Sequence, residues 1–284
     1  MLYRATHTTE YAYEATVSQC LSEVRLTPRA LPWQTLVESR IHTTPESASV
    51  SRHKDYFGNE VTSFTIVESH DKFTTVATSM VDVAERTMPA AADTPWETVR
   101  DDMAAHDRSE VLEAFEFTLA SPYVTTDQVL ADYARASFAP GRALTDAAGD
   151  LSHRIHVDFR YEPKATRIDT PTLDAFASRR GVCQDFSHVM IGALRSMGLA
   201  ARYVSGYLRS GTKYLGAEAS HAWVSVFVPG GGWFDLDPTN DVRPGTGHIT
   251  VAWGRDYGDV APVKGIALGG GKQVVEVEVR VEPV

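Results

Sequence analysis

The segment Gly181-Val182-Cys183-Gln184-Asp185-Phe186 places a cysteine directly ahead of a helical pattern. Apolar residues then recur at steps of three and four: Phe186, Val189, Met190, Ala193, Leu194 and Met197. This spacing predicts an amphipathic helix over about 183–197 that ends at Gly198. Cys183 would lie in its first turn, where unpaired backbone N–H groups and the helix dipole favour the thiolate over the thiol. A helix end contributes only about 0.3–1 kcal/mol, so a reactive thiolate needs a base nearby.

A histidine and two aspartates downstream are placed to supply that base. His221 opens a run of β-branched and aromatic residues over 221–228, which predicts a strand followed by a glycine-rich turn. The next segment, 232–237, reads as the return strand of a hairpin. A carboxylate on that strand can accept the second ring proton of the imidazole and stabilise the imidazolium. Alternation along the strand puts Asp235 and Asp237 on the same side, so periodicity leaves both open.

Each of these residues has an ordinary structural interpretation when it is taken alone. A lone helical cysteine is usually a small buried hydrophobe, and an aspartate before Pro-Thr is commonly a turn residue. A zinc site built from Cys183, His221 and an aspartate is conceivable by ligand type, but the chain lacks the paired Cys or His spacing of metal sites. The order Cys, His, Asp on elements suited to each role favours a nucleophilic site, and we expect no metal and no organic cofactor.

Four segments together resemble the core of bacterial transglutaminase-like proteins. These are Gly-Val-Cys-Gln-Asp-Phe at 181–186, Ala-Arg-Tyr-Val-Ser-Gly-Tyr at 201–207, Ser-His-Ala-Trp-Val at 220–224 and Gly-Trp-Phe-Asp-Leu-Asp-Pro-Thr-Asn at 232–240. The resemblance implies an α+β, papain-like core in which a cysteine-bearing helix packs on an antiparallel sheet. It also implies a catalytic triad with Cys183 as nucleophile, His221 as base and Asp237, which precedes Pro-Thr, as the third member.

The resemblance implies a cysteine peptidase or amidase rather than a protein cross-linker. A Cys183 thioester would then be hydrolysed, with a peptide, isopeptide or side-chain amide bond as the substrate. Transfer of the acyl group to an amine uses the same triad, so a transglutaminase-type transferase is the alternative. A peptide-binding relative without turnover is the second alternative. The sequence leaves the physiological substrate open.

Two groups are candidates for stabilising the oxyanion of a tetrahedral intermediate. The backbone N–H of Cys183 at the helix start is the natural first donor. Tyr161 lies upstream of the nucleophile at the place where the superfamily often sets an aromatic or polar side chain, so the resemblance makes it the second candidate. His188, five residues after Cys183, is expected to be a packing residue. His248 is within reach of the cleft, but we expect a surface position on a strand.

The chain divides into a β-rich part and a mixed part. Threonine-, tyrosine- and valine-rich runs separated by turns predict a β-sandwich-like N-terminal domain over 1–88. An Ala- and Pro-rich linker over 89–95 leads to the catalytic core at 96–262, with helices near 96–105, 125–137, 143–158 and 171–179. The tail at 263–284 contains an alternating strand over 273–282 that would join one of the two sheets. The edge strands of the β-domain would suit self-association.

Composition narrows the classes of partner. The chain has 284 residues, 43 % hydrophobic residues and a net charge of −10 without a basic run, which argues against nucleic acid or anionic lipid as partner. No segment approaches the roughly 18 apolar residues of a membrane span. The N-terminus lacks the apolar run of a secretory signal, and two cysteines build no disulfide framework. We therefore expect a cytoplasmic enzyme that acts on a peptide or protein.

Overall fold

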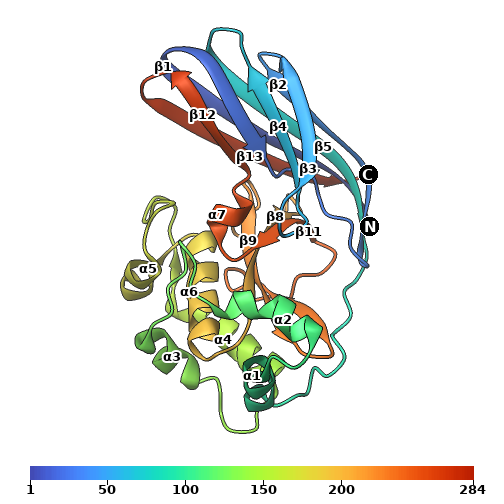
Figure 1. Cartoon of the computed structure of the whole chain (residues 1–284), viewed down its shortest axis with the longest axis vertical. Helices are drawn as coiled ribbons and strands as arrows, with labels where there is room; N and C mark the ends of the chain where they lie inside the picture. Colours follow the sequence, from blue (N-terminus) through green and yellow to red (C-terminus); the bar gives the residue numbers. More distant parts are fainter.

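Two antiparallel sheets and a group of helices build the chain, which a computed structural model describes over residues 1–284 (Figure 1). The larger sheet contains β1 (Leu2–Val24), β2 (Gln34–Thr44), β3 (Ser49–Lys54), β4 (Glu60–Ile66), β5 (His70–Val83), β12 (Val263–Gly269) and β13 (Gln273–Pro283). The smaller sheet has the order β10 (Gly232–Leu236), β9 (His221–Val228), β8 (Ala201–Leu208) and β11 (His248–Gly254). The predicted α+β class is confirmed.

The helices lie on the side of the smaller sheet in Figure 1. They are α1 (Trp96–Ala105), α2 (Ser109–Phe115), the short 3₁₀ helix η1 (Glu116–Thr118), α3 (Gln128–Arg135), α4 (Leu144–Asp158), α5 (Thr172–Ser178), α6 (Cys183–Ser196) and α7 (Tyr257–Val260). Five of them fall where the apolar periodicity predicts helices. The sequence analysis did not predict α2, η1 and α7, which are all short. None of the helices is both long and apolar enough to cross a lipid bilayer.

The larger sheet is sandwich-like because β1 serves two layers. The first half of this 23-residue strand pairs with β5 and β13, and the second half pairs with β4 and β12. The register shifts between Ala12 and Val17, where the strand passes from one layer to the other. A separate small core fills the space between the layers, comprising Val17, Cys20, Val24, Leu26, Phe64, Ile66, Phe73 and Ala77. The predicted β-sandwich-like N-terminal architecture is thus confirmed.

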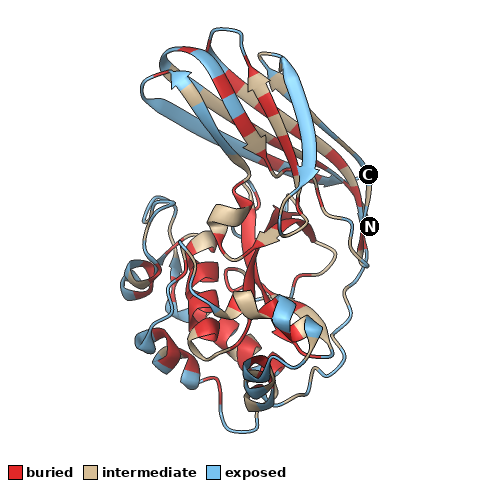
Figure 2. Cartoon of the chain, viewed as in Figure 1, coloured by how far each residue is buried: buried red, intermediate tan, exposed pale blue.

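Helix α6 packs against the smaller sheet and is the most buried helix of the chain. Every residue of β8 and β9 is buried, and so is every residue of α6 except Gln184 and Ser196 (Figure 2). Burial on both faces explains why these strands read as continuous apolar runs rather than alternating ones. Cys183 is the first residue of α6, and His221 is the first residue of β9. The packing of this helix on this sheet therefore fixes the positions of both residues relative to each other.

Two side-chain amides join the larger sheet to β11, the edge strand of the smaller one. The Gln34 amide donates to the Thr250 carbonyl at 2.7 Å and accepts the Thr250 N–H at 2.8 Å. Asn59 makes the same pair of bonds to the backbone of Trp253, at 2.8 and 3.0 Å. Both amides are buried. They satisfy backbone groups that a further strand would otherwise have to pair.

Candidate active site

The start of α6 is shaped by a glycine and an aspartate on either side of Cys183. The carboxylate of Asp185 accepts the backbone N–H of Val182 at 2.8 Å and the Thr166 hydroxyl at 2.6 Å. A Cβ at Gly181 would overlap this carboxylate, which explains a glycine two residues before the cysteine. Cys183 follows in the first turn, as predicted, and is only 9 % exposed.

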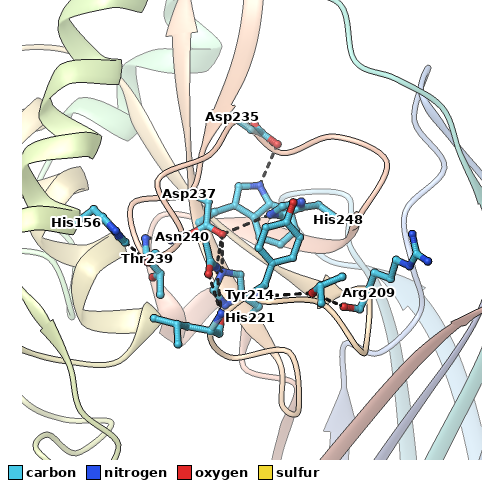
Figure 3. Close-up of polar contacts among 12 residues, drawn as sticks. His156, Arg209, Tyr214, His221, Asp235, Asp237, Thr239, Asn240 and His248 are labelled. Atoms are coloured by element: carbon cyan, nitrogen blue, oxygen red, sulfur yellow. Dashed lines mark hydrogen bonds and ion pairs between the residues drawn. The ribbon is translucent and has the colours of Figure 1, made fainter.

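The hairpin of β9 and β10 brings His221 against Asp237. His221 Nε2 lies 2.8 Å from Asp237 Oδ2, and both side chains are completely buried (Figure 3). Because a carboxylate only accepts, Nε2 carries the proton of this bond and Nδ1 is left for the other side of the ring. The structure therefore brings together the histidine and the aspartate that the family resemblance selected.

Asp235, the alternative that periodicity left open, has other partners. It accepts the Trp223 indole N–H at 2.9 Å and forms an ion pair with Arg86. Arg86 follows β5, so a residue from the larger sheet's side of the chain neutralises this carboxylate. The side chains of Arg86 and Asp235 are each only 10 % exposed. The alternation argument could not find Arg86, because it compares neighbours along one strand only.

The electrostatics of the pair favour a charged imidazole. Burial acts to lower the pKa of His221, but the Asp237 carboxylate, followed by the Cys183 sulfur, raises it to about 10. Burial likewise acts to raise the pKa of Asp237, and the His221 ring outweighs it and holds this pKa well below its usual range. An imidazolium–carboxylate pair is the form that balances charge in this buried place.

The second ring nitrogen of His221 lies against a glycine, and the Cys183 sulfur is close enough to the ring to help raise its pKa. Nδ1 is buried and has no hydrogen-bond partner. A Cβ built on Gly216 would lie 2.9 Å from Nδ1 and 3.5 Å from the Tyr161 hydroxyl oxygen, so the loop between β8 and β9 passes close to both. Gly216 has a φ of +81°, a left-handed conformation that also favours glycine. The sequence analysis did not single out Gly216, although a glycine in the segment leading to His221 could have indicated a close approach of the backbone to the histidine.

Tyr161 lies in β6 (Arg160–Tyr161), a two-residue strand that pairs with β7 (Arg180–Gly181) just before the cysteine. Its ring packs on Phe186 of α6 with 6.4 Å between ring centroids. Burial, then the proximity of Cys183, raises the pKa of Tyr161 to about 12, so its hydroxyl remains a donor at neutral pH. The predicted oxyanion candidate is thus placed beside the cysteine and the loop that carries Gly216.

Asn240 and His248 complete the surroundings of Asp237. Asn240 Nδ2 donates to Asp237 Oδ2 at 2.9 Å, while Asn240 Oδ1 accepts the backbone N–H of Leu215 at 2.7 Å. Asn240 thereby ties the loop that carries Gly216 to the buried carboxylate. His248 Nε2 lies 3.4 Å from the same oxygen of Asp237 (Figure 3).

The surface position expected for His248 is wrong. Its side chain is 1 % exposed and lies against Trp223 and Tyr214, with 5.4 Å between ring centroids in each case. The strand that carries it, β11, is buried over residues 248–252, so side chains on both of its faces are covered. His188 is a packing residue, as expected: it is buried and accepts the backbone N–H of Tyr257 at 3.2 Å.

Comparisons with known proteins agree with this architecture. Residues 3–82 match the bacterial transglutaminase-like N-terminal region, and residues 131–238 match the core of the transglutaminase-like superfamily. An uncharacterized protein of Mycobacterium tuberculosis is 38 % identical over 295 residues, covering 99 % of this chain and 92 % of that protein. The chain belongs to the transglutaminase-like superfamily.

The chain is also similar to one solved structure over nearly its whole length and to one transferase over part of its length. A crystal structure from Cytophaga hutchinsonii, described as that of a candidate cysteine protease, has a TM-score of 0.80 and covers 99 % of this chain and 90 % of its own. At 19 % identity it establishes the fold alone. A protein-glutamine gamma-glutamyltransferase of Pseudomonas aeruginosa is 35 % identical over 125 residues, covering 41 % of this chain and 18 % of that protein.

Proposed function

We propose that the chain is a thiol-dependent acyl-transfer enzyme that hydrolyses a peptide, isopeptide or side-chain amide bond through a thioester at Cys183. One observation carries the proposal. The buried His221 ring is held by Asp237 through Nε2, its Nδ1 has no hydrogen-bond partner, and the Cys183 sulfur lies close enough to help raise the pKa of the ring. An unsatisfied buried nitrogen costs free energy, and a catalytic role is one of the explanations for such a group.

The proposed reaction has two halves. The Cys183 thiolate attacks the amide carbonyl while the His221 imidazolium balances its charge, and the Cys183 N–H with the Tyr161 hydroxyl binds the oxyanion. The tetrahedral intermediate collapses, the C–N bond breaks, and His221 gives its proton to the leaving amine. Neutral His221 then takes a proton from water, which attacks the thioester. The C–S bond breaks, the carboxylic acid leaves, and Cys183 is restored as a thiolate beside the His221 imidazolium. Asp237 orients the ring in both halves.

Transfer of the acyl group to an amine is the second candidate. The match to a gamma-glutamyltransferase over 125 residues favours it, because the same thioester is resolved there by an amine in place of water. The substrate on either route is a peptide or protein.

A mixture of tiled decapeptides from β-casein, with dansylcadaverine as amine, tests both candidates. We expect new peptide ends or released ammonia with the wild type, and the loss of both with Cys183→Ala. Cys20→Ala is the matched control, because burial in the sandwich core raises the pKa of Cys20 and keeps it a neutral thiol. Dansyl incorporation in place of hydrolysis would assign the transferase. No product from the wild type would leave a binding protein without turnover, and equal product from wild type and Cys183→Ala would contradict the role of Cys183.

We also propose that the functional division follows the two sheets, with residues 1–88 as one domain, 89–95 as a linker, 96–262 as the catalytic core and 263–284 as a returning tail. We retain the cytoplasm as the predicted location, and self-association through the edge strands of the larger sheet as a prediction that size-exclusion chromatography tests.

A further inference from the structure

The two edges of the C-terminal strand β13 have different hydrogen-bond partners. One edge pairs with β1 throughout, and Val284 still donates to the Leu2 carbonyl at its end. The other edge meets the loop between β8 and β9: Val279 donates to the Glu218 carbonyl at 2.9 Å, and Val281 accepts the Ser210 N–H at 3.0 Å. The N–H of Val281 also donates to the Ser210 hydroxyl at 2.9 Å.

Alternation along β13 leaves part of this second edge open. Because successive residues of a strand direct their backbone groups to opposite edges, the odd-numbered residues here face away from β1. Val279 and Val281 are satisfied by the loop. Val275 and Val277 come next along the same edge, and no strand pairs with them there. Their side chains are 45 % and 42 % exposed, so solvent or a ligand reaches this edge.

The open edge borders a groove that leads to the candidate active site. The groove has a volume of about 910 Å³, within the range of cavities that bind ligands. Val277 and Val279 of β13 line one wall, and Tyr161, Gly216 and Ala219 line the other. Gly216 also lies against the His221 ring and Tyr161 lies close to Cys183, so the groove is continuous with the site.

We propose that the acyl-donor segment of the substrate is an extended peptide that binds as an added strand on β13. Its backbone bonds the N–H and C=O of Val277, with Val275 next along the edge, and it runs along the groove past Tyr161 towards Cys183. Strand addition supplies main-chain hydrogen bonds, and the groove walls contact alternate side chains. The substrate class is therefore an unfolded or extended peptide segment. The proposal rests on the proposed function.

A second copy of the chain is the competing occupant of an open strand edge. The groove favours a substrate, because residues of the candidate active site line it and a substrate must reach them. Pairing between two copies would place a strand in the groove and hinder entry to the site. The oligomeric state of the variants described next therefore distinguishes the two occupants.

Val277→Pro tests the proposal, because proline removes the outward N–H and leaves the bonds to β1 intact. We expect KM for the preferred casein decapeptide to rise about tenfold with kcat unchanged, as loss of a ground-state contact does. Val277→Ala, which keeps the N–H and shortens only a side chain of the groove wall, is the matched comparison and should raise KM by less than Val277→Pro does. Hydrolysis of p-nitrophenyl acetate, which is too short to reach β13, should not change. An unchanged KM in a folded Val277→Pro protein overturns the proposal.

Binding to the Cys183→Ala variant separates this proposal from the proposed function. Fluorescein-labelled casein decapeptides should bind it, and the added Val277→Pro change should weaken that binding about tenfold, whether or not the wild type turns them over. If Val277→Pro misfolds, N-methylation along the decapeptide replaces it, and weakening at every second amide is expected. Uniform weakening, or a Val277→Pro effect only on dimer formation in size-exclusion chromatography, overturns strand addition by the substrate.

Discussion

Asp237 is the residue on which the polar network of the candidate site converges. Its Oδ2 atom contacts the rings of His221 and His248 and the Asn240 amide, and its Oδ1 atom accepts the backbone N–H groups of Thr239 and Asn240. So many donors on one buried carboxylate keep it ionised and immobile. A fixed charge at this place in turn fixes the orientation and the charge of His221.

Replacement of Asp237 by asparagine should separate shape from charge. Asp237→Asn keeps the size of the side chain but removes the charge that raises the pKa of His221 to about 10. Burial, which lowers this pKa, would then dominate, and the ring would be neutral at pH 7. We expect kcat to fall by about 10³–10⁴. Nitrogen NMR of the His221 ring checks the charge, and a ring still protonated at pH 8 in the variant would contradict the assignment.

The raised pKa of His221 also sets the pH range in which the His221–Asp237 pair stabilises the folded protein. The folded-state pKa of His221 lies above its ordinary value of 6.5, so the pair contributes fully to stability below about pH 6.5. The contribution is lost as the pH rises through about 10. The difference in free energy of unfolding between wild type and His221→Gln should therefore shrink from pH 6 to pH 10, and urea titrations at both values measure it. A constant difference would contradict the raised pKa.

Asn240 should act as a positioning residue. Asn240→Ala removes the amide that joins Asp237 to Leu215, so the loop with Gly216 loses its attachment beside the His221 ring. We expect iodoacetamide to alkylate Cys183 with a changed rate and a shifted pH profile, and kcat to fall about tenfold, a size typical of residues that support a site indirectly. Asp241→Asn, which alters only an exposed pair with His153, is the matched control. Identical alkylation profiles would remove this role.

Among the elements, the residue pattern predicted the longer ones. The helix over 183–197 and the strand over 273–282 correspond to α6 and β13 within a residue or two. The short α2, η1 and α7 have too few turns for an apolar repeat to appear. The double pairing of β1 is also invisible in its own sequence, because the partners that make the two layers lie far along the chain.

The hydrogen bonds between the Gln34 amide and the edge of β11 can be tested by mutation. Gln34→Ala removes both bonds to the Thr250 backbone and leaves the buried Thr250 N–H unsatisfied, while the Thr250 C=O still accepts the Arg29 N–H at 3.1 Å. An unsatisfied buried group costs about 1–3 kcal/mol, so we expect the free energy of unfolding to fall by about 1–3 kcal/mol in urea denaturation. Gln19→Ala, at an exposed position of β1, is the control and should change it by less than about 0.5 kcal/mol. Equal effects would show that the amide is not a structural cap.

At the scale of the whole molecule, the two sheets share a hydrophobic core. One cluster of 47 buried residues joins Tyr3, Val81 and Val279 of the larger sheet to residues of α6 and the smaller sheet. The Arg86–Asp235 ion pair and the bonds from β13 to the loop cross the same boundary. The larger sheet is therefore part of the structure that holds the candidate site.

Shared burial predicts cooperative unfolding. We expect a single calorimetric transition in which the calorimetric and van't Hoff enthalpies agree, because separating the sheets exposes a common core. Scanning calorimetry of the full chain measures this directly. Two resolved transitions, with the sandwich core around Phe73 melting apart from the rest, would show that the sheets are independent folding units.

The sequence by itself determined the local pieces: the helix that begins at Cys183, the strand that begins at His221, the hairpin that follows and the sandwich-like N-terminal strands. The helix could be predicted because an apolar period near 3.6 residues is typical of a packed helix, and the strands because runs of β-branched and aromatic residues between turn signals are typical of strands. The Cys, His and Asp motifs added the family resemblance, which selected Asp237 over Asp235.

Only the tertiary structure decided the partners of those pieces. It placed Arg86 on Asp235, Asn240 between Asp237 and Leu215, Gln34 on the edge of β11, and the open edge of β13 beside the groove. It also buried His248, which the sequence had suggested for the surface. The physical reason is that hydrogen bonds between side chains and distant backbone depend on how the two sheets pack, and no local period in the chain encodes that packing.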